Sequence, residues 1–108
     1  MKTAGVATSA HALAETYATL SGDARLKINP HDAARMVADL AQTIDVHGLA
    51  ARPYLALIQA APALGIRGGS IFDAIHAQVA RESNCTEIHT LNARHFKHVA
   101  PDLKVMGL

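Results

Sequence analysis

In the stretch GGSIFDAIHA, residues 68–77, two glycines and a serine lead into an apolar run. Apolar residues at helical spacing after this glycine turn predict a helix over residues 70–82. One acid, Asp73, interrupts the run near its start. Ser70 and Asp73 have the spacing of a capping box, which would explain the acid by local hydrogen bonding. Alternatively, Asp73 belongs to a site, because a carboxylate at the edge of an apolar face needs a partner such as a metal ion.

Short strands and helices alternate along the rest of the chain. Further helices are expected over residues 10–20, from residue 30 onward, over 52–64 and briefly over 93–98, with strands over 4–8, 44–47, 86–92 and 103–108. Strands separated by helices are typical of a parallel sheet with right-handed crossovers. The predicted fold class is therefore α/β, with a parallel β-sheet and flanking helices in a single domain, residues 1–108.

Capping residues and apolar stripes define the expected helices more closely. Ser9 and the Asn29-Pro30 pair are the predicted helix starts, while Ser21-Gly22 and Pro62 are the predicted ends. The residues expected to face the core are Leu13, Tyr17, Leu20, Ala33, Met36, Val37, Leu40, Ile44, Tyr54, Leu57, Ile58, Ala61, Phe72, Ile75 and Val79.

Composition narrows the function classes. The formal net charge is +1, which argues against binding a polyanion by bulk charge alone. A lone cysteine, Cys85, excludes an internal disulfide and fits a cytoplasmic protein. The N-terminus has no signal-peptide pattern, and the longest apolar segment is too polar and too broken by proline to cross a bilayer.

Three polar residues fall where strands end or the following helices begin: Glu15, Asp73 and Asn92. Sites in parallel sheets lie at these places. Two carboxylates and an amide oxygen suit Mg²⁺ or Mn²⁺, which activate water and stabilise phosphoryl oxygens. The structural alternatives are an ion pair of Glu15 with His11 one turn back, and an N-cap role for Asn92.

Basic residues near the same strand ends are candidates for holding phosphates. They are Arg67, Arg94 and Lys97, and the alternative for each is a solvated surface charge. A zinc site of His89, His95 and His98 is a weaker hypothesis, because the chain has no H-E-x-x-H motif and one Cys only.

Three segments in this order resemble the PIN domain: SAHALAETYATL (9–20), GGSIFDAIHAQVA (68–80) and TLNARHF (90–96). The closest likeness is to the VapC-type toxins of bacterial type II toxin–antitoxin pairs, and it covers nearly the whole chain. The resemblance implies a Mg²⁺- or Mn²⁺-dependent ribonuclease with a PIN-like three-layer fold, an antitoxin partner and a homodimer. It also implies that Glu15, Asp73 and Asn92 are site positions, Asn92 standing where the family commonly has Asp.

The sequence departs from the family at its start. PIN domains open with a strand that ends in Asp-Thr or Asp-Ser and is followed by two helices, whereas this sequence starts at the family's second strand. We therefore expect a fold that lacks the first strand, the first two helices and the first metal-binding Asp. Nuclease activity should be impaired. A partner chain, in a dimer that is intertwined or swapped, would fill the gap, unless the strands near Val6 and Ile88 pair directly. The alternative function is a non-catalytic PIN-like module that binds RNA or a protein.

Overall fold

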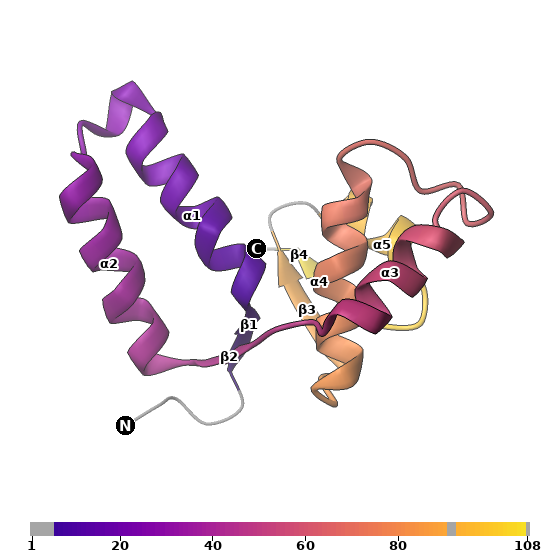
Figure 1. Cartoon of the computed structure of the whole chain (residues 1–108). Coiled ribbons are helices and arrows are strands. Elements are labelled where there is room, and N and C mark those ends of the chain that lie inside the picture. The colour runs from indigo at the N-terminus through magenta and orange to yellow at the C-terminus, as the bar shows by residue number, and fades with distance from the viewer. Residues whose placement is uncertain (1–5, 91–92, 108) are drawn as a thin grey trace. The chain divides into compact units, whose positions relative to one another are not determined.

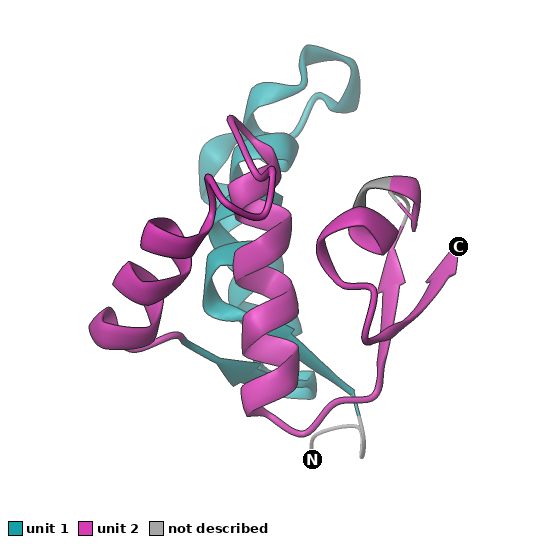
Figure 2. Cartoon of the chain, turned by 90° about the vertical axis from the view of Figure 1, so that its right-hand side faces the viewer, with its two compact units in different colours: residues 1–48 teal, residues 49–108 magenta. Residues whose placement is uncertain are grey.

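A computed structural model gives the fold of the chain and describes residues 6–90 and 93–107 (Figure 1). The chain divides into two compact units, residues 1–48 and residues 49–108 (Figure 2). Each unit contains one small parallel sheet of two strands among its described residues, and helices connect the strands. The predicted mixed α/β class with parallel strands is confirmed.

Unit 1 is a strand–helix–helix–strand segment. Its elements are β1 (Ala7–Ser9), α1 (Ala10–Gly22), a short 3-10 helix (Ala24–Leu26), α2 (Pro30–Thr43) and β2 (Asp45–His47). The strands β1 and β2 are parallel, with Ser9 opposite His47 at the end of the pair. The helices α1 and α2 lie between these strands in the chain and pack against each other.

The predicted helix starts in unit 1 are confirmed. The Ser9 hydroxyl accepts a hydrogen bond from the Ala12 amide at 3.0 Å, and the Asn29 side chain accepts one from the Asp32 amide at 2.8 Å. Pro30 is the first residue of α2, where its missing N–H costs nothing. The predicted stop at Ser21-Gly22 is confirmed, because α1 ends at Gly22, two residues beyond the expected last residue Leu20. The Ser21 hydroxyl donates to the carbonyl of Tyr17 one turn back.

The predicted apolar face of α2 is only partly buried. Ala33 is buried, but Met36 and Leu40 are 46% and 44% exposed. In α1 the predicted core residue Tyr17 is also exposed. Small units bury a low fraction of their surface, so a helix pair with a two-stranded sheet leaves part of each apolar stripe uncovered. The apolar residues do recur at helical spacing, but the prediction from this spacing overestimated how far they are buried.

Unit 2 contains the helix that the stretch at residues 68–77 predicts. Its elements are α3 (Ala51–Ala60), α4 (Ser70–Glu82), β3 (Glu87–Thr90), α5 (Ala93–Val99) and β4 (Lys104–Gly107). Within it, α4 has the predicted bounds, while α3 ends before Pro62. The strands β3 and β4 are parallel, with Ile88 opposite Val105 and α5 in the crossover. The helix α4 runs antiparallel to β3, so its start and the end of β3 lie towards the same end of this unit (Figure 2).

Small side chains build the core of unit 2 around one aromatic ring. The buried cluster comprises Ala61, Ile66, Ala74, Ala77, Phe96, Val99 and Ala100. Alanines on α4 let α5 approach closely, and Phe96 fills the space between the two helices. Ile75 and Val79 are buried as predicted, but Phe72 is 42% exposed. Phe72 is two positions from Ala74, about 200° around the helix, so it points away from the side that carries the alanines.

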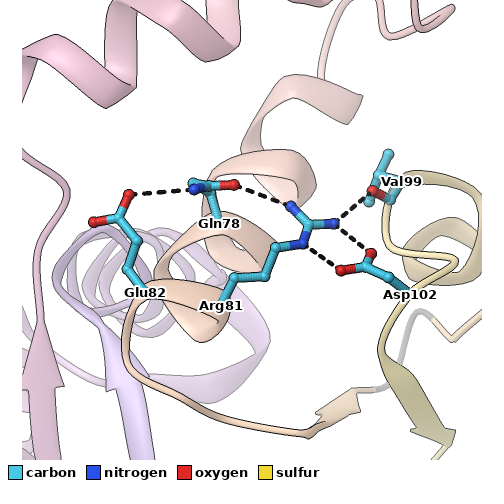
Figure 3. A network of polar contacts seen from close by, with 5 residues as sticks. All are labelled: Gln78, Arg81, Glu82, Val99 and Asp102. Carbon is cyan, nitrogen blue, oxygen red and sulfur yellow. Dashed lines mark hydrogen bonds and ion pairs between the residues drawn. The ribbon is translucent and has the colours of Figure 1, made fainter.

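A charged clamp ties the last turn of α4 to the turn between α5 and β4 (Figure 3). Arg81 donates two hydrogen bonds to the Asp102 carboxylate, from Nε and Nη2, each at 2.7 Å. Its Nη1 donates to Gln78 Oε1 at 3.1 Å, and Nη2 also lies 3.5 Å from the carbonyl oxygen of Val99. Hydrogen bonds from Arg81 lower the pKa of Asp102, and Asp102 raises the pKa of Arg81. Paired forks of this kind are the stronger surface ion pairs.

Replacement of Asp102 by asparagine should therefore weaken unit 2 in a pH-dependent way. The pKa of Asp102 is lowered in the folded chain, so its stabilisation is present above the ordinary Asp pKa of about 3.9 and is lost as pH falls through the lowered value. Because the Asp102 side chain is 53% exposed, we expect a loss of ~0.5–1 kcal/mol in the free energy of unfolding at neutral pH. Urea unfolding at pH 7 and pH 3 measures it, with Asp39→Asn on exposed α2 as control. An equal loss at both pH values would contradict this role.

Candidate functional site

Asp73 is half-buried near the start of α4, and no capping box explains it. Ser70 is itself the first residue of the helix, and Gly69 occupies the N-cap position without a side-chain hydrogen bond. The Ser70 hydroxyl instead accepts from the Arg67 amide at 3.0 Å and donates to the Arg67 carbonyl at 2.7 Å. Gly68 has a φ of +58°, a conformation that favours glycine, in this turn. The predicted capping box is therefore wrong, because Ser70 closes the preceding loop instead of capping the helix.

Two neighbours define the surroundings of Asp73 within unit 2. Ala74 is buried in the core, so Asp73 lies at the border of the packed face. His76, one turn further along α4, is half-buried, and its ring centroid lies 6.3 Å from that of Phe96 with the rings tilted by 32°. The sequence places His76 one turn after Asp73 but indicates no function for it, because its contact with α5 is tertiary and leaves no local pattern.

The third candidate, Asn92, lies outside the described residues. The strand β3 ends at Thr90 and α5 begins at Ala93, which brackets the position of Asn92 in the chain. The predicted roles of Asn92 as an oxygen ligand or as an N-cap both stay predictions. The side chain of His95 also lies outside the described part of the chain, so the zinc hypothesis stays a prediction too.

Glu15 lies on α1 of unit 1, six residues beyond Ser9 at the end of β1. Its Oε1 atom is 3.7 Å from Nε2 of His11, and its side chain is 48% exposed. The predicted pairing of Glu15 with His11 is confirmed. At this distance and exposure the pair contributes little to stability.

The donor chemistry of the candidates fits a hard divalent cation. Glu15 and Asp73 offer carboxylate oxygens and Asn92 an amide oxygen, which are ligands that Mg²⁺ and Mn²⁺ take. Among the side chains that the structure describes, which exclude those of residues 1–5, 91–92, 95 and 108, no group of three or more His, Cys, Asp or Glu is arranged to hold a metal ion. Glu15 belongs to unit 1 and Asp73 to unit 2. The surroundings of each carboxylate are therefore described within its own unit.

The predicted phosphate-binding residues all lie in unit 2 and are exposed. Arg67 is in the loop before α4, while Arg94 and Lys97 are one turn apart on α5. His98 is exposed beside them, and Phe96 and Val99 of the same helix are buried. The outer face of α5 is therefore basic and its inner face is apolar, an arrangement that presents the cations to solvent and to any anionic ligand.

A family model described as PIN domain matches residues 1–101. The chain belongs to the PIN domain family. This confirms the family predicted from the segments 9–20, 68–80 and 90–96. PIN domains are generally nucleases, and they typically use divalent metal ions. Comparisons with curated proteins and with solved structures give no significant match. Among the described residues of this PIN domain, none of the helices has the length and apolar character needed to cross a membrane.

Proposed function

We propose that this PIN domain is a Mg²⁺- or Mn²⁺-dependent endoribonuclease of the VapC type, the toxin of a type II toxin–antitoxin pair. The observation that carries the proposal is the place of Asp73, which is a half-buried acid in the first turn of α4, at the border of the packed face. Acids held at the border of a core are candidates for a functional site.

Each site residue has a distinct role in this proposal. Glu15, Asp73 and Asn92 would hold the divalent ion through oxygen atoms, and Arg67, Arg94 and Lys97 would hold RNA phosphates. When bound, the ion supplies an activated water and stabilises the phosphoryl oxygens. Two carboxylates and one amide are a weak donor set for a hard cation, so we expect low activity from the 108-residue chain alone.

The proposal also covers partners and location. We expect an antitoxin protein to inhibit the toxin, and a second copy of the chain to form a homodimer, which is intertwined if segments exchange. Two-stranded sheets leave strand edges that another chain can pair with, which favours such association. The expected compartment is the cytoplasm, because a single cysteine gives no internal disulfide. Light scattering measures the dimer, and a monomer at micromolar concentration would contradict it.

The deciding experiment is a cleavage and binding assay with labelled single-stranded RNA. The purified chain should cut slowly with Mn²⁺ and not at all with EDTA. Cutting that resists EDTA would contradict metal dependence, and rapid, complete cutting would contradict the low activity expected of this donor set. Binding to RNA without any cutting would instead support the alternative function, a non-catalytic PIN-like binding module.

RNA binding should depend on the basic face of α5. We expect the double change Arg94→Gln and Lys97→Gln to weaken binding and to reduce the slope of log affinity against log salt by about 0.7 for each phosphate that the chain no longer neutralises. The control is Arg35→Gln, an exposed arginine on α2 whose partner is Asp32. Fluorescence anisotropy across a salt series measures both quantities, and an unchanged slope in the double variant would exclude these residues as phosphate ligands.

A further inference from the structure

Arg67 lies in a short loop whose backbone is held on both sides. Ile66, directly before it, is 8% exposed and belongs to the core of unit 2, and its amide donates to the Ala61 carbonyl at 3.0 Å. Directly after Arg67, Gly68 has a φ of +58° and leads the chain towards the start of α4. Segments with buried side chains and hydrogen-bonded backbone groups open rarely, so this loop is a firm support for the residue at its centre.

The hydroxyl of Ser70 makes two hydrogen bonds to the backbone of this one arginine. It accepts from the Arg67 amide at 3.0 Å and donates to the Arg67 carbonyl at 2.7 Å. A hydroxyl can do both at once, because it carries one hydrogen and two lone pairs. The amide and the carbonyl stand on either side of the Arg67 Cα atom, so one serine side chain fixes the backbone from which the arginine side chain projects.

The guanidinium of Arg67 is available for a ligand. The residue is exposed, and within the described part of the chain no carboxylate forms an ion pair with it. Arg81 differs in this respect, because its guanidinium is bound by Asp102. An exposed arginine on a fixed backbone can bind an anion at a lower cost in conformational entropy than an arginine on a mobile loop.

The place of Arg67 suits the proposed substrate. Arg67 precedes the first residue of α4 by three positions, and Asp73 is in the first turn of that helix. The cation and the proposed metal ligand therefore lie at the same end of α4. A ribonuclease that cuts at a metal ion has to hold RNA phosphates close to that ion, and a planar guanidinium matches a phosphate with two parallel N–H donors.

We infer that Ser70 is a positioning residue for RNA binding, whose hydroxyl holds the backbone of Arg67 so that the guanidinium meets an RNA phosphate beside the start of α4. The inference rests on the proposed function, which assigns Arg67 to the phosphates. Ser70 acts through Arg67 and does not itself contact the RNA. Threonine at position 70 keeps the hydroxyl and should serve in the same way, whereas alanine should not.

The test is a double-mutant cycle of Ser70→Ala and Arg67→Gln, measured by fluorescence anisotropy with labelled single-stranded RNA in EDTA, which prevents metal-dependent cleavage. Arg67→Gln should weaken binding on the order of tenfold, the scale of a hydrogen bond to a charged group. Ser70→Ala should weaken it on the order of threefold, the scale of ordering one long side chain. In a chain that already carries Arg67→Gln, Ser70→Ala should have no further effect.

A second readout follows the loop without RNA. Amide hydrogen exchange at Arg67 should become faster in Ser70→Ala, because the amide loses its acceptor, and should stay slow in Ser70→Thr. The matched control is Ser83→Ala, which removes a serine hydroxyl at the opposite end of α4. This control should leave both the exchange at Arg67 and the RNA affinity as they are.

The outcomes separate the positioning role from the proposed function. A loss of affinity confined to chains that retain Arg67, and restored by Ser70→Thr, supports the positioning role. Wild-type affinity in Ser70→Ala, or a loss that persists in full beside Arg67→Gln, would overturn it while leaving Arg67 as a phosphate ligand. Wild-type affinity in Arg67→Gln would refute the phosphate role of Arg67 and the positioning role with it. Absence of RNA binding by the wild-type chain would refute the proposed function itself.

Discussion

Replacement of Phe96 by alanine is expected to lower the free energy of unfolding of unit 2 by about 3–5 kcal/mol. Phe96 is 6% exposed and lies in a core otherwise made of alanine, valine and isoleucine. The small neighbours cannot extend into the space that the ring leaves, so a cavity adds to the lost burial. Small domains have total stabilities of roughly 5–15 kcal/mol, so this one change would remove much of the margin.

The chain offers a matched control for this prediction, because its second phenylalanine, Phe72, is 42% exposed on α4. We expect Phe72→Ala to cost less than about 1 kcal/mol, a value typical of surface changes. Urea unfolding followed by circular dichroism measures both variants. Equal losses in Phe96→Ala and Phe72→Ala would show that the core of unit 2 is not centred on Phe96.

Replacement of Asp73 by asparagine is expected to abolish Mn²⁺-dependent RNA cleavage and to weaken Mn²⁺ binding on the order of 100-fold. Residues that only orient metal ligands lower the metal affinity by about 10–100-fold when they are replaced. Because Asp73 is proposed to be a ligand itself, we expect a loss at the upper end of this range. Asparagine keeps the size and one oxygen of the side chain but removes the charge that holds a hard cation. We expect the fold to tolerate the change, because asparagine has the size and shape of aspartate and the loop before α4 is closed by the hydrogen bonds between Ser70 and Arg67.

Two controls make the result interpretable. Asp39→Asn changes an exposed acid on α2 and should leave cleavage and Mn²⁺ affinity as they are. The thermal midpoint of Asp73→Asn should stay within a few degrees of wild type, which a ligand role predicts. A large drop in that midpoint would show that Asp73 serves the fold. Cleavage at the wild-type rate in Asp73→Asn would remove this residue from the site.

Elements with strong local signals could be predicted from the sequence. The bounds of α4, the caps at Ser9 and Asn29 and the strand at residues 45–47 all follow from spacing, capping chemistry and alternation. Burial could not be read in the same way. Met36, Leu40 and Phe72 fit apolar stripes but are exposed, because burial depends on what the rest of the fold places over a stripe.

In the candidate site, too, some features could be predicted from the sequence and others could not. The residue types and their order predicted the PIN family, which the match over residues 1–101 confirms. The local role of Ser70 was predicted wrongly. A serine hydroxyl can bond to the backbone three residues before it as well as three residues after it, and Ser70 bonds to Arg67. The contact of His76 with Phe96 spans two elements and could not be predicted from periodicity.

The crossover between β3 and β4 has a consequence for how unit 2 folds. Parallel strands need a connection of a dozen or more residues, and this connection occupies residues 91–103 with the short helix α5 inside it. Because the loop between β3 and β4 is short, bringing the two strands together costs little conformational entropy. Contacts between residues close in sequence also tend to form early in folding. We therefore expect β3, α5 and β4 to fold as a local nucleus, with Phe96 at its centre, onto which α4 then docks.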